Sequence, residues 1–248
     1  MNSLPGYYKT NPRALRFCEA GRMGGNVLAY PFCYIVTRFM APQGALWMPD
    51  LWAESACPKE ELSRRFWEFT TPHRLELNRL GFQELEFSRI KRNLDPNGRD
   101  NGGITYLDAT RSHTCLLAYL HLSTPGPVVR NVEKAVVAFS AALPSGALSV
   151  TNNRASFDAG PGQRTVRVVT ENLQVLYDAL LKEIRAAGET PAVFPDKASV
   201  ERWFDENQLI AFEDRARRGL YVRMSDAEVE MARRKLPPPV PLEDQKIA

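Results

Sequence analysis

The chain contains 248 residues, of which 44% are hydrophobic and 25% charged, and its formal net charge is +3. These values are ordinary for a globular protein and suit one large domain, or a compact core with extensions. The longest nearly apolar run, Val27 to Val36, is far shorter than the roughly 20 residues that a membrane-spanning helix needs. The sequence therefore argues against a membrane span, whereas a segment that lies at a membrane interface is allowed.

The cysteines give no sign of a metal site or of a disulfide framework. No two of them show the Cys-x-x-Cys spacing that zinc sites use, so we predict no metal and no cofactor. Residues 1–11 are polar and carry a proline, which does not suit a signal peptide. We therefore expect a reducing, cytoplasmic location, with attachment to the periphery of a membrane as one option. The four cysteines are Cys18, Cys33, Cys57 and Cys115.

Basic residues are concentrated near the start of the chain. Residues 1–40 contain five lysines and arginines and one glutamate, so the remaining residues carry a small net negative charge. A basic segment of this kind suits a nucleic acid or an anionic membrane surface. The alternative interpretation is a solubilising tail.

The first elements predicted along the chain are an arm and a strand. Prolines and glycines interrupt residues 1–25, which predicts an arm without a core of its own. Residues 28–39 are rich in β-branched and aromatic side chains, and this composition favours a strand. Pro31 restricts that strand to the edge of a sheet or to a later start.

A helical region is predicted over about residues 59–80. Pro58 suits the first position of a helix, and Gly81 suits the left-handed residue that ends one. Thr71–Pro72 suits a second helix start, so we predict a helix pair or one kinked helix. The apolar side chains that share one helical face are Leu62, Phe66 and Phe69.

Short segments of alternating or β-branched sequence follow, separated by turn signals. We expect strands over residues 83–93, 104–109, 113–123, 132–143, 147–152 and 164–169. Turns are expected at residues 95–98, 110–112 and 144–146, and residues 124–127 break the strand pattern. Short strands joined by tight turns predict a mostly antiparallel sheet of about six strands.

Three helical stretches are predicted after the strands. The first covers residues 173–184, and the second runs from Val200 to about Arg218. Ser225 and Glu228 form a capping box for a third, short helix that ends near Lys235. The glycines that end the first two helices are Gly188 and Gly219.

Together these elements predict an α+β fold, an antiparallel sheet of about six strands flanked by helices, with extended N- and C-terminal arms. The helices before and after the strands are expected to cover the sheet. The expected parts are an N-terminal arm with an aromatic docking segment (1–53), a helix and sheet core (54–190), C-terminal helices (191–236) and a proline-rich tail (237–248).

Aromatic side chains are concentrated in residues 26–53. Tryptophan and tyrosine favour surfaces with one apolar and one wet side, such as protein interfaces and membrane boundaries. The other interpretation of this segment is a strand and a loop that lie over the core. The candidate partner-binding residues are Tyr30, Phe32, Tyr34, Phe39, Trp47 and Trp52, together with Arg13, Arg16 and Arg22.

A second candidate site lies on the strand that begins at His113. On an unbroken strand His113 and His121 lie roughly 26 Å apart, too far to share one metal ion. Asp108 could face His113 across the hairpin, which would give an Asp–His pair without a nucleophile. The simpler interpretation is a histidine that is hydrogen-bonded within the sheet. The residues that would line a pocket on this face are Asp108, His113, Cys115, Tyr119 and His121.

Two local patterns resemble a set of bacterial proteins of uncharacterised function. One is the end of the first helix, Leu77-Asn78-Arg79-Leu80-Gly81-Phe82, and the other is the hairpin Leu143-Pro144-Ser145-Gly146-Ala147-Leu148-Ser149-Val150-Thr151-Asn152-Asn153. The resemblance covers about residues 58–188 and implies a helix packed on an antiparallel sheet. It implies no activity and no catalytic residue, and it favours a location near a membrane.

These observations favour a non-enzymatic accessory or scaffold protein. We expect it to dock through residues 1–53 onto a larger protein assembly or a membrane face. One alternative is an enzyme or small-ligand-binding domain with a pocket on the His113 face. A less favoured alternative is a single-stranded nucleic-acid binder that uses Arg13, Arg16, Arg22, Tyr7 and Tyr8.

Overall fold

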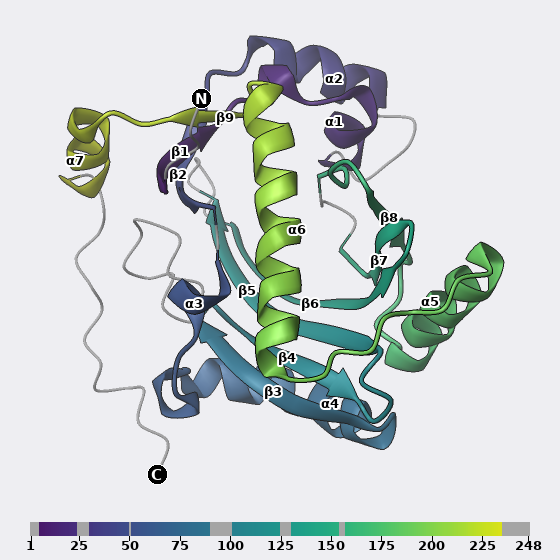
Figure 1. The fold of residues 1–248 in the computed structure, drawn as a ribbon. Helices are drawn as coiled ribbons and strands as arrows, with labels where there is room; N and C mark the ends of the chain where they lie inside the picture. Colours follow the sequence, from purple (N-terminus) through teal and green to yellow (C-terminus); the bar gives the residue numbers. More distant parts are fainter. Residues whose placement is uncertain are drawn as a thin grey trace.

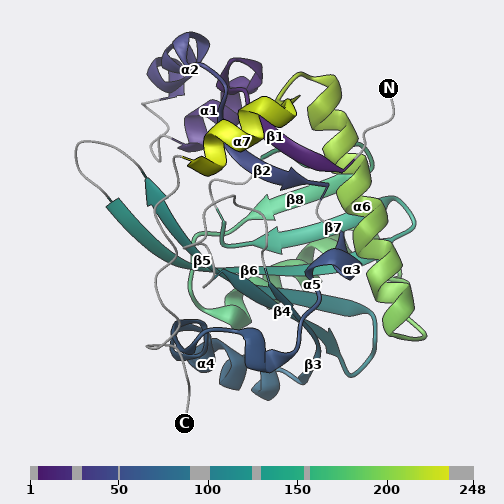
Figure 2. The ribbon, with the colours of Figure 1, turned by 90° about the vertical axis from the view of Figure 1, so that its left-hand side faces the viewer.

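The computed structural model describes residues 5–23, 30–49, 51–89, 101–124, 130–153 and 157–234. Within them the chain forms a six-stranded sheet, a smaller three-stranded sheet, and helices on both faces of the larger sheet. The long helix α6 (Lys197–Arg217) crosses one face, while α4 (Arg64–Arg79) and α5 (Leu173–Ala187) lie on the other (Figures 1 and 2). The predicted α+β class is confirmed.

The larger sheet has the strand order β3-β4-β5-β6-β7-β8. Its neighbours pair antiparallel except β7 and β8, which are parallel, so the predicted antiparallel sheet is in fact mixed. The connection from β7 to β8 is long enough to return the chain to the same end of the sheet, which a tight turn cannot do. The strands are β3 (Phe82–Arg89), β4 (Gly102–Asp108), β5 (His113–Thr124), β6 (Arg130–Leu143), β7 (Gly146–Thr151) and β8 (Gln163–Arg167).

Two tight turns form where the sequence predicts them. Arg111 (φ 60°) lies in the β4–β5 turn, and its N–H donates to the carbonyl of Asp108 at 3.0 Å. Gly146 (φ 126°) begins β7, and a Cβ atom there would lie 1.9 Å from the carbonyl oxygen of Gly162. Only glycine fits that position. Three predicted features lie outside the described residues. They are the turn at 95–98, residues 125–127 of the break predicted at 124–127, and the tail at 237–248.

The main hydrophobic core lies between the larger sheet and the helices α4 and α5. Alternate residues of each strand point to this side, as the period of two requires. Helix α5 is amphipathic and buries one side along its whole length, as predicted. The fully buried side chains at the centre include Phe66, Leu77, Tyr106, Leu117, Tyr119, Phe139, Leu176 and Leu180.

Helix α4 is a single helix that begins later than predicted. Its N-cap is Ser63, whose hydroxyl accepts a hydrogen bond from the backbone N–H of Phe66 at 3.1 Å. Pro72 lies inside the helix instead of starting a second one. Pro72 and Glu68 are both exposed, so the hydrogen bond to the Glu68 carbonyl that the proline cannot make is missing on the solvent side of the helix. Gly81 (φ 84°) follows the helix end, as predicted.

The predicted C-terminal helices are confirmed. Asp196 caps α6 by accepting from the N–H of Ser199 at 2.7 Å, and the helix stops before Gly219 (φ 74°). The side chain of Glu228 accepts from the N–H of Ser225 at 2.9 Å, and this pair begins α7 (Asp226–Arg234).

The N-terminal residues form part of the fold instead of the predicted arm. Strand β1 (Gly6–Thr10) lies between β2 (Gln43–Met48) and β9 (Tyr221–Arg223) in the smaller sheet, so backbone pairing holds it on both sides. The 3-10 helix η1 (Pro12–Ala14) and helix α1 (Phe17–Met23) follow β1. Two further short elements, α3 (Trp52–Ser55) and η3 (Lys59–Glu61), lead to α4.

The strand predicted over residues 28–39 is wrong, because Tyr30–Phe39 form helix α2. Pro31 is the second residue of this helix, where no backbone N–H is needed for an internal hydrogen bond. Composition favoured a strand here, but Phe32, Ile35, Val36 and Phe39 have the spacing of one helical face.

Phe66 offers a test of the main core. We expect Phe66→Ala to lower the free energy of unfolding by about 3–5 kcal/mol, because it removes a fully buried ring at the centre of the core. Leu75→Ala on the same helix is the matched control, since Leu75 is 56% exposed. Urea denaturation of both variants measures the difference. Equal losses in the two variants would contradict this account of the core.

Candidate docking surface

Helix α2 presents an apolar outer face to solvent. The four side chains of this face recur at positions i, i+3, i+4 and i+7 of the helix. Phe32 is 69% exposed, Ile35 58%, Val36 39% and Phe39 80%. A large apolar cluster that stays in contact with water marks an interaction surface. Figures 1 and 2 show α2 at the outer edge of the molecule, on the opposite side of α1 from the larger sheet.

The inner face of α2 packs against α1. The ring of Phe17 contacts Tyr30 and Tyr34 edge-on, at centroid distances of 6.1 and 5.5 Å. A Cβ atom at Gly21 would lie 2.1 Å from the Tyr30 ring, so only glycine allows the two helices to approach this closely. Two of the predicted docking aromatics therefore hold the helix in place. The small cluster beneath them is Leu15, Ala20 and Leu220, with Ala14, Tyr34 and Phe157 packed against it.

A buried carboxylate anchors α1 to the C-terminal half of the chain. Glu19 is 2% exposed, and its side chain accepts hydrogen bonds from the backbone N–H of Arg16 at 2.8 Å and of Asp158 at 2.9 Å. The guanidinium of Arg218, at the end of α6, donates to both of its oxygens at 3.1 and 2.8 Å. The N-terminal helices are thus tied to the residue that ends the longest helix.

Asp158 lies within ion-pair distance of two of the predicted docking arginines. Arg22 forms an ion pair with it, and only 15% of the Arg22 side chain is exposed. Arg16 lies 3.6 Å from the same carboxylate but keeps 52% of its side chain exposed. Arg22 therefore belongs to the interior, whereas Arg16 remains accessible.

Arginines also flank the C-terminal end of α2. The exposed Arg13 donates from Nε to the carbonyl of Met40 at 3.1 Å. Arg38 lies over the Tyr34 ring at 4.1 Å and is partly exposed. The only acidic residue among residues 1–49 is Glu19, which is buried. The outer face of α2 is thus apolar with a basic border.

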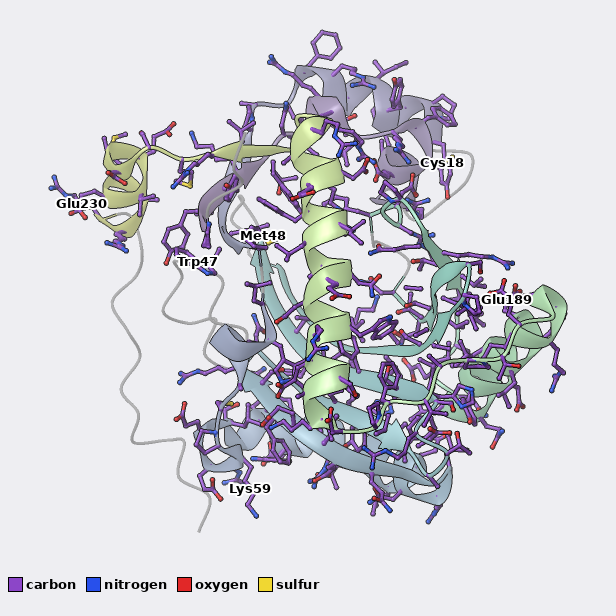
Figure 3. The ribbon with its side chains drawn as sticks, in the orientation of Figure 1. Cys18, Trp47, Met48, Lys59, Glu189 and Glu230 are labelled. Atoms are coloured by element: carbon purple, nitrogen blue, oxygen red, sulfur yellow. The ribbon has the colours of Figure 1, made fainter. Side chains whose placement is uncertain are left out.

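The two tryptophans predicted to share this surface lie elsewhere. Trp47 belongs to β2 and packs edge-on against Tyr7 at 5.2 Å, and Figure 3 shows it on the opposite side of α6 from Cys18 of α1. Trp52 packs against Phe204 of α6 at 5.3 Å. Tyr8 is 5% exposed and packs on Phe212 at 5.2 Å, so the aromatic and basic residues suggested for nucleic-acid binding do not form one surface.

The predicted Asp–His pair is present at the start of β5. His113 Nδ1 lies 3.0 Å from Asp108 Oδ2 and 3.1 Å from the hydroxyl of Tyr177. Burial alone raises the pKa of Asp108, but hydrogen bonds from His113 and Thr110 outweigh it and lower the pKa from 3.8 to about 2. Burial, together with the Asp108 charge, raises the pKa of Tyr177. The pair joins β4, β5 and α5 at the edge of the core.

The remaining residues of that predicted pocket belong to the packed interior. Cys115 and Tyr119 are fully buried beneath α4 and α5, and burial raises the pKa of the Cys115 thiol. A thiol of this kind is not poised as a nucleophile. His121 lies in β5, and its side chain is outside the described part of the structure.

The described residues contain neither a membrane-spanning helix nor a metal-binding cluster, and comparisons with known proteins give no match. In the described ranges no helix is long and apolar enough to cross a bilayer. In the same ranges no group of three or more His, Cys, Asp or Glu side chains could hold a metal ion. Neither family models, nor curated proteins, nor solved structures give a match to this chain. The resemblance to bacterial helix-and-sheet proteins therefore stays a prediction.

Several residues of this surface were not predicted. Ile35 and Val36 complete the outer face of α2, and their helical spacing with Phe32 and Phe39 was a signal in the sequence that could have found them. Glu19 and its partners carried no such signal, because Arg218 lies 199 residues away along the chain.

Glu19 tests how the docking surface is held. We expect Glu19→Gln to lower the free energy of unfolding by about 3–5 kcal/mol, because it removes the buried charge that Arg218 pairs with and leaves only Asp214, 3.6 Å away, to offset the guanidinium. The matched control is Glu230→Gln, which removes an exposed ion pair with Arg234 and should cost less than about 1 kcal/mol. Urea denaturation measures both. Equal small effects would show that the Glu19 pair contributes little.

The Asp108–His113 pair predicts a defined pH dependence. Because folding lowers the Asp108 pKa to about 2, the ionised carboxylate stabilises the fold above about pH 4 and loses this effect as the pH falls towards 2. We expect Asp108→Asn to cost roughly 2 kcal/mol at pH 7 and progressively less below pH 4. Chemical denaturation at pH values from 7 to below 4 measures this loss of stability, with Glu213→Gln on the exposed side of α6 as control. A cost that does not change with pH would contradict the assignment.

Proposed function

We propose that this protein is a non-enzymatic accessory protein that attaches to an anionic membrane surface through the outer face of α2. The observation that carries the proposal is the exposed apolar row of Phe32, Ile35, Val36 and Phe39 with arginines at its border. A helix of this length spans about 15 Å, so it would lie flat at the level of the lipid headgroups.

The charges around α2 favour a lipid surface over a second copy of the chain. Arg13 and Arg38 are at least partly exposed, and so is Arg16, which also lies 3.6 Å from Asp158. The single acidic residue among residues 1–49, Glu19, is buried. Two copies packed through α2 would bring these cations together, and like charges at an interface cost free energy. Anionic headgroups would neutralise the same cations, at about 1 kcal/mol for each basic residue near the surface.

The apolar row adds the second part of the binding free energy. Transfer of Phe32 and Phe39 from water into the interfacial region contributes on the order of 1.5–3 kcal/mol for each ring. Their helix stays correctly oriented because Tyr30 and Tyr34 fix its other side against α1. A rigid helix loses little conformational entropy on binding.

Co-sedimentation with lipid vesicles tests the proposal. We expect the protein to bind vesicles made of equal parts phosphatidylcholine and phosphatidylserine, and to bind pure phosphatidylcholine more weakly. The double variant Phe32→Gln/Phe39→Gln should bind the mixed vesicles at least about tenfold more weakly. Leu75→Gln/Val193→Gln is the matched control, because both residues are exposed but lie on α4 and on the loop before α6.

Two outcomes would contradict the membrane proposal. One is a wild-type protein that does not sediment with the mixed vesicles, and the other is a double variant that binds them as well as the control does. If the wild type does not sediment, a protein that co-purifies with the wild type but not with the double variant would assign the outer face of α2 to a protein assembly.

A further inference from the structure

Helix α6 covers the second face of the larger sheet without filling the space between them. Its buried residues are Val200, Ala211 and Phe212, and its middle part carries the polar Asn207 and Gln208. The strands beneath it bear small side chains at the same level. A cleft of about 190 Å³ remains between α6 and strands β6, β7 and β8. It lies on the opposite side of the sheet from the main core.

A row of hydroxyl groups forms the floor of this cleft. Ser140 of β6 pairs with Ser149 of β7, and Ser149 pairs with Thr165 of β8, so the three residues stand side by side across three strands. All three line the cleft, and the hydroxyl oxygens of Ser140 and Ser149 lie 2.7 Å apart. A hydroxyl both donates and accepts, so this row suits a ligand with hydroxyl groups of its own.

The roof of the cleft changes from aromatic to cationic along α6. Trp203, Asn207, Ala211 and Arg215 follow each other at intervals of four residues, which places them on one side of the helix. Trp203 therefore gives an apolar wall at one end and Arg215 a guanidinium at the other. This gradient would orient a ligand that has one anionic end.

Two amides hold the helix at a set distance from the sheet. Gln163 of β8 donates from Nε2 to the backbone carbonyl of Asn207 at 2.7 Å and to its side-chain oxygen at 3.0 Å. The Gln163 side-chain oxygen in turn accepts from the N–H of Gly160 at 3.1 Å. The cleft is thus kept open by hydrogen bonds that exist before any ligand binds, and preformed sites bind at a lower entropic cost.

The charges of the cleft favour an anion. Arg215 is the cation of its roof, whereas Arg164, which also borders the cleft, pairs its guanidinium with Glu183 of α5. Among the described residues no acidic side chain lines the cleft. The Arg215 guanidinium donates from Nη2 to the carbonyl of Asp158 at 3.3 Å, while its Nε is buried and has no hydrogen-bond acceptor in the described part of the chain. A buried donor of this kind requires an acceptor, and a carboxylate is the acceptor whose planar geometry a guanidinium matches best.

We propose that this cleft binds a small hydroxylated carboxylate. The carboxylate would pair with Arg215, the hydroxyl groups would bond to the Ser140–Ser149–Thr165 row, and the carbon chain would lie against Trp203. The volume is below the roughly 300–1,000 Å³ typical of sites for drug-sized ligands, so the ligand is of the size of a sugar acid or smaller. The site is independent of the outer face of α2.

Titration calorimetry with D-gluconate tests the proposal, and sorbitol serves as the neutral probe of the same carbon skeleton. We expect gluconate to bind the wild type and sorbitol to bind at least about tenfold more weakly, because it lacks the charge that Arg215 pairs with. Arg215→Gln should weaken gluconate binding by a similar factor. Arg202→Gln is the matched control, since it removes the same charge from an exposed position of α6.

A second variant keeps the test valid if Arg215→Gln fails to fold. Ser149→Val removes the central hydroxyl of the row and adds volume to the floor of the cleft, so it should also weaken gluconate binding while leaving the charge intact. Wild-type protein that binds no gluconate overturns the proposal. Gluconate binding that is equal in wild type and Ser149→Val, or that sorbitol matches, overturns it as well.

Discussion

The hydrogen bonds to the buried Glu19 carboxylate join three segments that lie far apart in the chain. They hold α1 against the loop at Asp158 and against Arg218 at the end of α6. Helix α2 contacts the rest of the molecule largely through α1, so its orientation depends on this anchor. A charge buried with several hydrogen-bond donors specifies one geometry, because any displacement would leave a charge unpaired in a medium of low polarity.

The larger sheet has two faces of different chemistry. One face forms the main hydrophobic core, and the other face carries the proposed ligand site. Large apolar side chains such as Tyr119 and Phe139 meet α4 and α5 and leave a close-packed interior. The opposite face bears serine, threonine and alanine opposite the polar middle of α6. Because small polar side chains cannot fill the gap to a helix, a cleft remains beneath the middle of α6.

Much of the secondary structure could be predicted because it depends on neighbouring residues. The end of α5 at Gly188 and the turn before Gly146 are set by left-handed glycines, and the start of α7 is set by a capping box. The prediction failed at residues 28–39, where composition favoured a strand although the apolar spacing was helical. It also missed the parallel pairing of β7 with β8, since pairing direction depends on the path of a long connection.

The candidate docking surface could be predicted only in part. The sequence by itself determined that the N-terminal region is aromatic and basic, that residues 1–40 hold one acidic residue, and approximately where the helices after the larger sheet begin and end. Only the tertiary structure decided that Phe32 and Phe39 face solvent, that Trp47 and Trp52 pack elsewhere, and that Arg22 is neutralised by Asp158. Local spacing fixes caps, turns and helical faces, whereas burial and charge pairing arise between residues that are distant along the chain.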